Sequence, residues 1–302
     1  MICLIWRQHR GQALWTVITV TALCALTVSF GISAGHWLAG YHGWLRQLAA
    51  AGCPPPEAHS GVFHVRSAAT CSALKGRYPG GLQAAFSSRF SSAILFSQDG
   101  LPAGFAIIGA MIGAPLVARE IEQRTQFTAW TQSVSRRRWY VSKIAALAAA
   151  LAVAGLTAGT ANAWLQHQLT AGDTAATRWS WFVSINLALA GEAALAFALG
   201  VSFGALLRRT LPAIGATAAG FIVLLLGARW IVQALTPVSQ ATGPHVTTLP
   251  GSWILGSGTG TKVSYHPPAQ YWPLQLTLLA ILLAVAGAAL ASGWQATRTR
   301  GV

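Results

Sequence analysis

The chain has 302 residues, of which 54 % are hydrophobic and only 9 % are charged, and its mean hydropathy is +0.51. Soluble domains carry roughly 25 % charged residues, so this composition excludes a water-soluble globular protein. A net charge of +14 would suggest nucleic-acid binding in a soluble protein. In a membrane protein, however, basic residues mark cytoplasmic loops and meet anionic lipid. We therefore expect these charges to contact the lipid bilayer, and we expect no nucleic-acid partner.

Apolar residues are concentrated in six stretches that contain almost no charge. Each reaches the roughly 18–20 residues that a helix needs to cross about 30 Å of hydrocarbon. The stretches are residues 14–37, 101–118, 144–164, 181–207, 211–235 and 273–293. Because only helices and closed barrels satisfy their backbone polar groups in lipid, the sequence predicts an all-α membrane protein. We expect one membrane domain over residues 1–302, with six transmembrane helices and a retained first helix.

Gly-x-x-x-Gly spacing occurs once in each of the first four stretches. The pairs are Gly31/Gly35, Gly109/Gly113, Gly155/Gly159 and Gly200/Gly204. Missing side chains let helix backbones approach closely, which favours packing between helices of this chain. A dimer face is the alternative interpretation.

The distribution of basic residues predicts the orientation of the chain. Twelve of the 20 Lys and Arg residues lie in four short segments: before the first stretch, after the second, after the fourth and after the last. The positive-inside rule then places both termini in the cytoplasm. The outer side receives two long loops, 40–98 and 236–271, with Pro54–Pro56 opposing regular structure in the first.

Two of the four cysteines, Cys53 and Cys71, share this large first outer loop. In an oxidising compartment they could form a disulfide. Two free thiols are equally compatible with the sequence.

Residues for catalysis are not apparent in the sequence. The eight histidines are scattered, only six acidic residues exist, and there is no His-Glu-x-x-His motif. The segment 256–262 superficially resembles a phosphate-binding loop, but Thr261 separates Gly260 from Lys262 where a true motif has Gly-Lys. We expect no catalytic residue, no metal site and no nucleotide site on this chain, and interpret this segment as a flexible loop.

Glu192 is the one acidic residue deep within an apolar stretch. An ionised carboxylate there would cost several kcal/mol in hydrocarbon, so we expect it to face protein or water. A structural hydrogen bond and a contact with substrate or a proton both remain open. Arg229 is a candidate partner, but the stretch boundaries place Glu192 about 15 Å deep and Arg229 near the outer end of the fifth stretch. Direct pairing would therefore require a tilted helix or a long reach.

The cytoplasmic segment 119–143 has the most informative pattern. Phe127, Trp130 and Val134 form a short apolar face at helical spacing, which predicts a small amphipathic helix over 125–134. Ser135 can cap a second helix that begins at Arg136 and runs through the third stretch, about 43 Å in length. This arrangement suits the transmission of force to a cytoplasmic partner. A helix that rests on the lipid surface is the alternative.

This segment, together with residues 6–10, resembles the membrane subunit of bacterial ATP-binding-cassette exporters of the type-2 permease family, especially actinobacterial members. Those proteins carry an acidic pair, a Thr, and a Ser-x-Ser-Arg-x-Arg-Trp motif before the third span. The matching residues are Glu120, Glu122, Thr125, Ser133, Ser135, Arg136, Arg138 and Trp139. Arg124 departs from the pattern, because the family often has Gly before the Thr. The 236–271 loop is too polar to show the short re-entrant helices that members often have there.

The resemblance implies a coupling helix that docks into a separate ATPase subunit. The docking residues would be Glu120, Glu122, Thr125, Phe127, Trp130, Val134, Ser135 and Arg136. ATP and Mg would bind to that partner, with no cofactor on this chain. Two copies, or this chain and a related one, would form the substrate pathway in a bacterial inner membrane, and Glu192 is the candidate contact there. The alternative function is a membrane scaffold or sensor that binds a cytoplasmic protein and transports nothing; a membrane enzyme is a more remote third.

Overall fold

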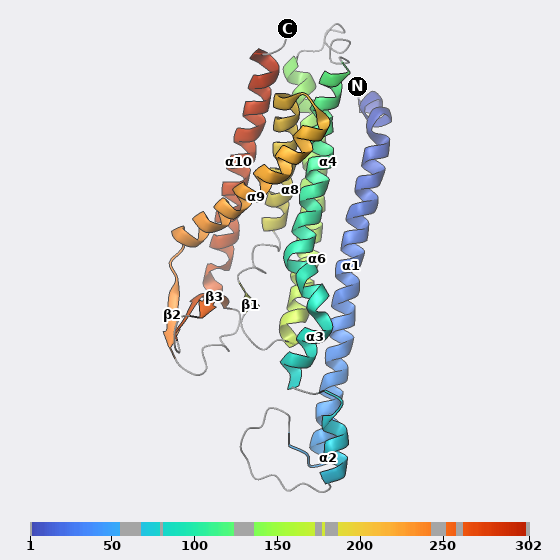
Figure 1. The fold of residues 1–302 in the computed structure, drawn as a ribbon, viewed down its shortest axis with the longest axis vertical. Helices are drawn as coiled ribbons and strands as arrows, with labels where there is room; N and C mark the ends of the chain where they lie inside the picture. Colours follow the sequence, from blue (N-terminus) through green and yellow to red (C-terminus); the bar gives the residue numbers. More distant parts are fainter. Residues whose placement is uncertain are drawn as a thin grey trace.

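A computed structural model describes residues 2–54, 68–78, 81–123, 136–172, 177–178, 187–242, 252–257 and 262–299. Within these residues six helical segments are long and apolar enough to cross a membrane, as predicted (Figure 1). The start of the first helix and the end of the last lie at the same end of the bundle, as an even number of spans requires.

Each spanning segment contains one long helix. These helices are α1 (Ile2–Ala50), α4 (Leu101–Glu122), α6 (Arg136–Gly172), α8 (Leu187–Leu207), α9 (Thr210–Leu235) and α10 (Tyr271–Thr299). Helix α4 is preceded by α3 (Gly81–Leu95) and a π-helical turn, η1 (Phe96–Gly100), which together extend the second span to Ala84–Glu122. As predicted, one continuous helix runs from Arg136 through the third stretch.

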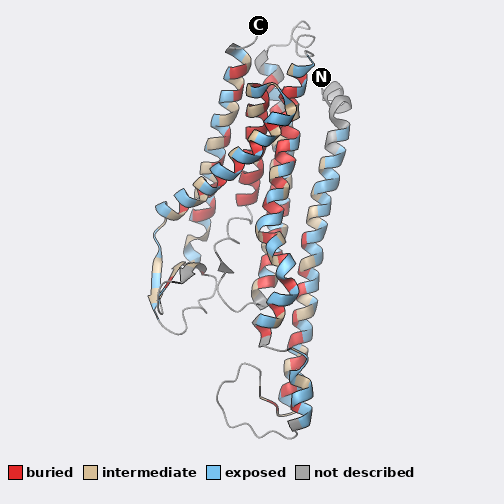
Figure 2. Cartoon of the chain, viewed as in Figure 1, coloured by how far each residue is buried: buried red, intermediate tan, exposed pale blue. Residues whose placement is uncertain are grey.

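Helix α8 is the core of the bundle. It packs against α4, α6, α9 and α10, and Figure 2 shows it buried along most of its length. The glycine pairs of α4 and α8 face each other. A Cβ atom on Gly204 would lie 2.5 Å from the carbonyl oxygen of Ala114, and one on Gly200 would lie 2.9 Å from the Ala114 nitrogen. These two glycine motifs therefore serve backbone packing between two helices of one chain.

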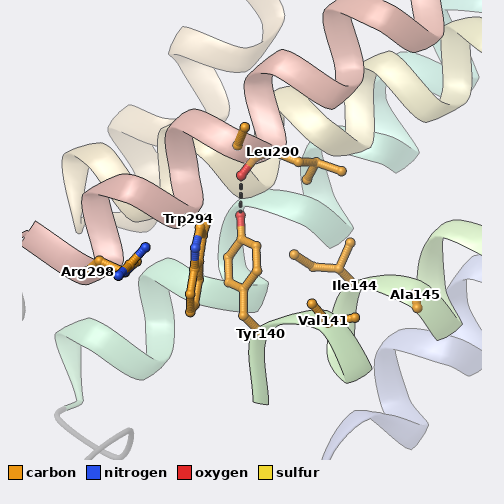
Figure 3. A pocket seen from close by; sticks show the side chains of 8 residues that line it. Tyr140, Val141, Ile144, Ala145, Leu290, Trp294 and Arg298 are labelled. Atoms are coloured by element: carbon orange, nitrogen blue, oxygen red, sulfur yellow. Dashed lines mark hydrogen bonds between the residues drawn. The ribbon is translucent and has the colours of Figure 1, made fainter. Parts of the chain in front are cut away.

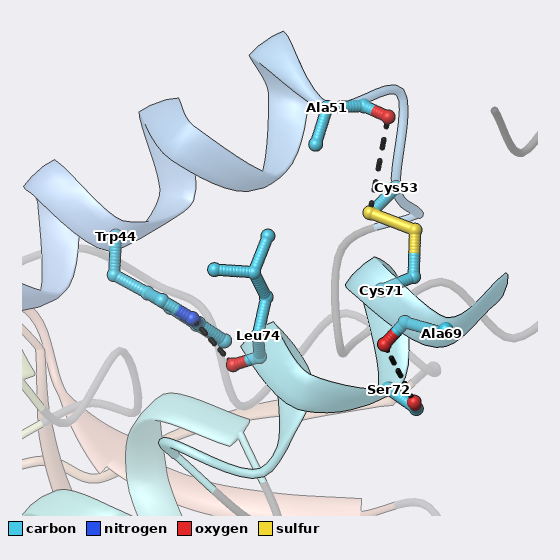
Figure 4. Close-up of a disulfide and its surroundings, with 7 residues drawn as sticks. All are labelled: Trp44, Ala51, Cys53, Ala69, Cys71, Ser72 and Leu74. Atoms are coloured by element: carbon cyan, nitrogen blue, oxygen red, sulfur yellow. Dashed lines mark hydrogen bonds between the residues drawn. A yellow bond between two sulfur atoms is a disulfide. The ribbon is translucent and has the colours of Figure 1, made fainter. Parts of the chain in front are cut away.

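The prediction of an irregular outer loop over 40–98 is wrong over most of its length. Helix α1 continues to Ala50, and α2 (Ala68–Lys75), α3 and η1 occupy much of the remainder. The physical reason is an aromatic stripe at helical spacing in α1, formed by Trp37, Tyr41 and Trp44. The latter two side chains are almost fully buried, and the indole nitrogen of Trp44 donates a 2.7 Å hydrogen bond to the Leu74 carbonyl (Figure 4). The burial of these aromatic side chains stabilises α1 beyond the part that spans the bilayer.

Cys53 and Cys71 form a disulfide in the structure, with their Cα atoms 5.6 Å apart (Figure 4). The bond joins the residues just after α1 to α2, beside the Trp44–Leu74 contact. It therefore closes the outer end of α1 against the next helix.

The second outer region contains strands rather than only loop. Strands β2 (Ser239–Thr242), β3 (Trp253–Ser257) and β4 (Lys262–His266) join β1 (Thr177–Arg178) in a sheet of order β1-β3-β4-β2. The β2–β4 and β3–β4 pairs are antiparallel, and β1 pairs with β3 in parallel. The sheet lies at the end of the bundle opposite the two termini (Figure 1). It ties the connection between α6 and α8 to the connection between α9 and α10, while residues 258–261 of the predicted flexible loop lie outside the described residues.

The packing of α4 on α8 leads to a stability prediction. Gly204→Leu should destabilise the purified protein by about 1–3 kcal/mol, because the new side chain must displace α4 backbone. The matched control is Gly215→Leu, since a Cβ atom at Gly215 meets nothing within 4 Å. Thermal unfolding in detergent measures both, and equal unfolding temperatures would contradict the close α4–α8 contact.

Candidate functional site

The predicted acidic pair lies at the C-terminal end of α4. Glu120 is buried, whereas Glu122 is exposed and reaches the first residue of α9. One oxygen of Glu122 accepts the Thr210 backbone N–H at 3.1 Å, and the other accepts the Thr210 hydroxyl at 2.9 Å. Arg209 at the N-cap of α9 supplies no side-chain cap. The Glu122 carboxylate therefore caps α9 from a neighbouring helix, where its negative charge also suits the helix dipole.

The turn between α8 and α9 is short, with Arg208 and Arg209 between the two helices. Arg208 adopts a left-handed backbone conformation, with φ of 56°. Such a conformation is uncommon for a residue other than Gly, Asn or Asp and allows a tight reversal. It brings Thr210 back beside the end of α4.

Most of the predicted docking residues lie outside the part of the chain that the structure describes. Thr125, Phe127, Trp130, Val134 and Ser135 lie outside the described residues. Arg136 begins α6, but its side chain also lies outside the described residues. The docking role of the segment therefore stays a prediction, and the structure defines its two anchors, the end of α4 and the start of α6.

Glu192 forms an ion pair with Arg229 inside the bundle. The Oε1 atom of Glu192 accepts a 3.0 Å hydrogen bond from Nη2 of Arg229. The Glu192 side chain is fully buried and that of Arg229 is 22 % exposed. Within the described residues, Oε2 of Glu192 and Nε of Arg229 have no hydrogen-bond partner. The pair thus retains one acceptor and one donor that a ligand or a water could meet.

The sequence suggested that direct pairing of these two residues would require a tilted helix or a long reach, and the two side chains do pair. Arg229 lies about 9 Å from the end of α9 at Leu235. Helix α9 is also inclined to α8 (Figure 1). The two side chains therefore meet at the same depth.

A second polar cluster, which the sequence analysis missed, joins η1 to α6. The buried Ser97 hydroxyl donates to Oδ1 of Asn162 at 2.9 Å, and the Asn162 amide donates to the Ser97 carbonyl at 3.0 Å. The Gln166 amide donates to the Ser97 hydroxyl at 3.3 Å. Asn162 and Gln166 are four residues apart in an apolar helix, and this spacing was the available signal. The π-helical turn at Ser97 is a local irregularity that often marks functional positions.

The polar clusters of the described residues connect helices to one another. Among the residues that the structure describes, there is no group of three or more His, Cys, Asp or Glu side chains able to hold a metal ion. The polar side chains instead link pairs of helices: Glu122 links α4 to α9, Glu192 links α8 to α9, and Ser97 links η1 to α6. This arrangement is suited to holding and moving helices.

The fold and these sites define a multi-pass helical membrane protein whose polar contacts link its helices. The family described as ABC-2 membrane transporter related matches residues 48–233, which is more than half of the chain. The chain therefore belongs to this family and is a membrane subunit of an ABC transporter, of the type-2 permease class. A search of curated proteins found no match, and a search of solved structures also found none.

The Glu192–Arg229 ion pair predicts how substitutions at these two positions change the free energy of unfolding. Arg229→Met should destabilise the protein by about 3–5 kcal/mol, because it leaves a buried carboxylate without its partner. The double variant Glu192→Leu with Arg229→Met should recover much of that loss, since both charges are removed together. Thermal unfolding of the single and double variants measures the coupling. Additive effects of the two substitutions would contradict a direct pair.

Proposed function

We propose that the chain is the permease subunit of an ABC exporter and that a separate ATPase subunit drives it through the segment 119–143. The observation that carries the proposal is the family match over 48–233, which includes this segment and the helices on both sides of it. The dense basic charge around the segment further supports a cytoplasmic position. We assign the chain to a bacterial cell membrane on the same resemblance.

The docking contacts are proposed from the pattern of the segment. The apolar face of Phe127, Trp130 and Val134 fills a cleft of the ATPase subunit, with Trp130 as its largest anchor. Glu120 and Arg136 flank this face at the ends of α4 and α6. ATP and Mg bind to the partner, and this chain supplies no ligand to them.

The Glu122–Thr210 contact gives the docking segment a route into the bundle. Glu122 is the last residue of α4, lies near the start of this segment, and holds the first turn of α9. Helix α9 is held a second time, near its other end, by the Arg229–Glu192 pair. A displacement of the segment by the ATPase would therefore act on α9 through a charged hydrogen bond. We propose that this displacement switches the pathway between inward-facing and outward-facing states.

Two permease chains form the pathway in this proposal. The apolar side chains of α9 that face away from the bundle suit either lipid or a second chain, and they include Val223 and Trp230, each 69 % exposed. The Glu192–Arg229 pair, with its free acceptor and donor atoms, is the candidate contact for the transported substrate. The second candidate function, a scaffold or sensor, rests on the same cytoplasmic segment but needs no ATPase.

Co-purification in mild detergent tests the proposal. The wild-type protein should co-elute with an ATPase subunit, and Trp130→Ala should lose most of that subunit together with transport. Trp272→Ala is the matched control, because Trp272 is exposed at the other end of the bundle. Co-elution of a cytoplasmic protein that hydrolyses no ATP would favour the scaffold, and wild-type transport in Trp130→Ala would contradict docking through this face.

A second variant separates docking from transmission. Thr210→Pro removes both donors to Glu122, and Pro fits the first residue of a helix. The preceding residue, Arg209, already has the extended backbone that Pro requires, with φ of −134° and ψ of 129°. We expect Thr210→Pro to retain the ATPase subunit but to lower transport per ATP hydrolysed at least severalfold in reconstituted vesicles. Unchanged coupling would exclude Glu122–Thr210 as the link.

A further inference from the structure

A groove opens between α6 and α10 at the end of the bundle that carries the termini (Figure 3). Its volume is about 890 Å³, within the roughly 300–1,000 Å³ of small-molecule sites. Four lining residues come from the first turns of α6 and four from the last turns of α10. They are Tyr140, Val141, Ile144, Ala145, Leu290, Ala291, Trp294 and Arg298.

The lining changes from charged to aromatic to aliphatic along the groove. Arg298 lies at one end, with its guanidinium carbon 5.9 Å from the centre of the Trp294 ring. The Trp294 and Tyr140 rings are 5.4 Å apart, and the Tyr140 hydroxyl donates a 3.0 Å hydrogen bond to the Leu290 carbonyl (Figure 3). Beyond the rings the wall consists of aliphatic side chains, including Ile144. This order of groups matches an amphiphile with an anionic head.

The position of the groove matches the membrane boundary. Tyr140 is the first residue of the third apolar span, and Arg298 is the last residue of the sixth. Arg298 therefore lies at headgroup depth, the aromatic rings lie at the interface, and the aliphatic wall lies in hydrocarbon. The basic segments of the sequence make this the cytoplasmic side.

We propose that this groove binds an anionic phospholipid of the cytoplasmic leaflet. The lipid phosphate pairs with the guanidinium of Arg298, which has no carboxylate partner in the described part of the chain. One acyl chain lies along Val141 and the small side chains of Ala145 and Ala291, all three of which are exposed. The charge at the mouth favours a lipid over a second copy of the chain, whose own basic cytoplasmic residues would repel it. The site does not depend on the proposed transport function.

Native mass spectrometry of the full-length protein in dodecyl maltoside tests the site. Equal amounts of dioleoyl phosphatidylglycerol and dioleoyl phosphatidylcholine are added, and the retained lipid is counted. The wild-type protein should retain the anionic lipid about fivefold more, as expected for one basic residue at an anionic surface. Arg298→Gln should remove this preference. Arg209→Gln is the matched control, an exposed arginine on the same side of the membrane, and should keep the preference.

A second pair of variants tests the acyl-chain part without altering charge. Ala145→Leu fills the groove and should lower retention of both lipids severalfold, while Ala150→Leu, an exposed position elsewhere on α6, should not. Equal retention of the two lipids by the wild-type protein, or an unchanged preference in Arg298→Gln, would overturn the proposal. Loss of a dimer in Ala145→Leu with unchanged lipid retention would assign the groove to a second copy and would also overturn it.

Discussion

The contact between α4 and α8 is the constraint on which the rest of the bundle depends. The carbonyl and amide groups of Ala114 occupy the space where side chains of Gly204 and Gly200 would otherwise stand. In a bilayer there is no hydrophobic drive to bring two helices together, so close van der Waals packing must supply the affinity. Because α8 also contacts α6, α9 and α10, this one contact fixes the position of the helix around which the others are arranged.

Polar contacts then determine how the remaining helices lie against this core. A buried polar side chain in hydrocarbon is tolerated when it finds a partner on another helix. Asn162 and Gln166 of α6 meet Ser97 of η1, and Arg229 of α9 meets Glu192 of α8. Each contact has few alternatives at its depth. These side chains therefore select one register of α6 and one of α9, which apolar packing alone would leave less defined.

The number of membrane-spanning helices could be predicted because lipid imposes a minimum length on each of them. The helical extension around Tyr41 and Trp44 was not predicted, because Pro54–Pro56, which follow it, indicated an irregular loop. Predicting the Glu192–Arg229 pair requires the bounds and the tilt of α8 and α9, and a hydropathy pattern gives neither. The Ser97 cluster depends on a π-helical turn with no sequence signature. Whether Phe127 and Trp130 dock into an ATPase stays a prediction.

The two ends of the molecule differ in how firmly they are connected. At the outer end a disulfide closes α1 against α2, and a sheet joins two connections that are far apart in sequence. At the end that carries the termini, Glu122 and Thr210 link α4 to α9 through two hydrogen bonds, next to the close packing of α4 on α8 at Gly204. Covalent bonds and sheet pairing resist displacement, whereas two hydrogen bonds at an exposed site can re-form after a shift of the helix. The outer end is therefore built as a fixed point.

Helix α9 packs on the bundle through one face, unlike α8. Its buried residues form a single stripe along the helix, whereas α8 is buried on nearly all sides. The stripe consists of Ala213, Thr217, Phe221, Leu225, Ala228 and Val232. Sliding or rolling one stripe over a neighbour disturbs fewer contacts than moving a helix packed on all faces. A shift of α9 would thus act, through Arg229, on the fully buried carboxylate of Glu192 in α8.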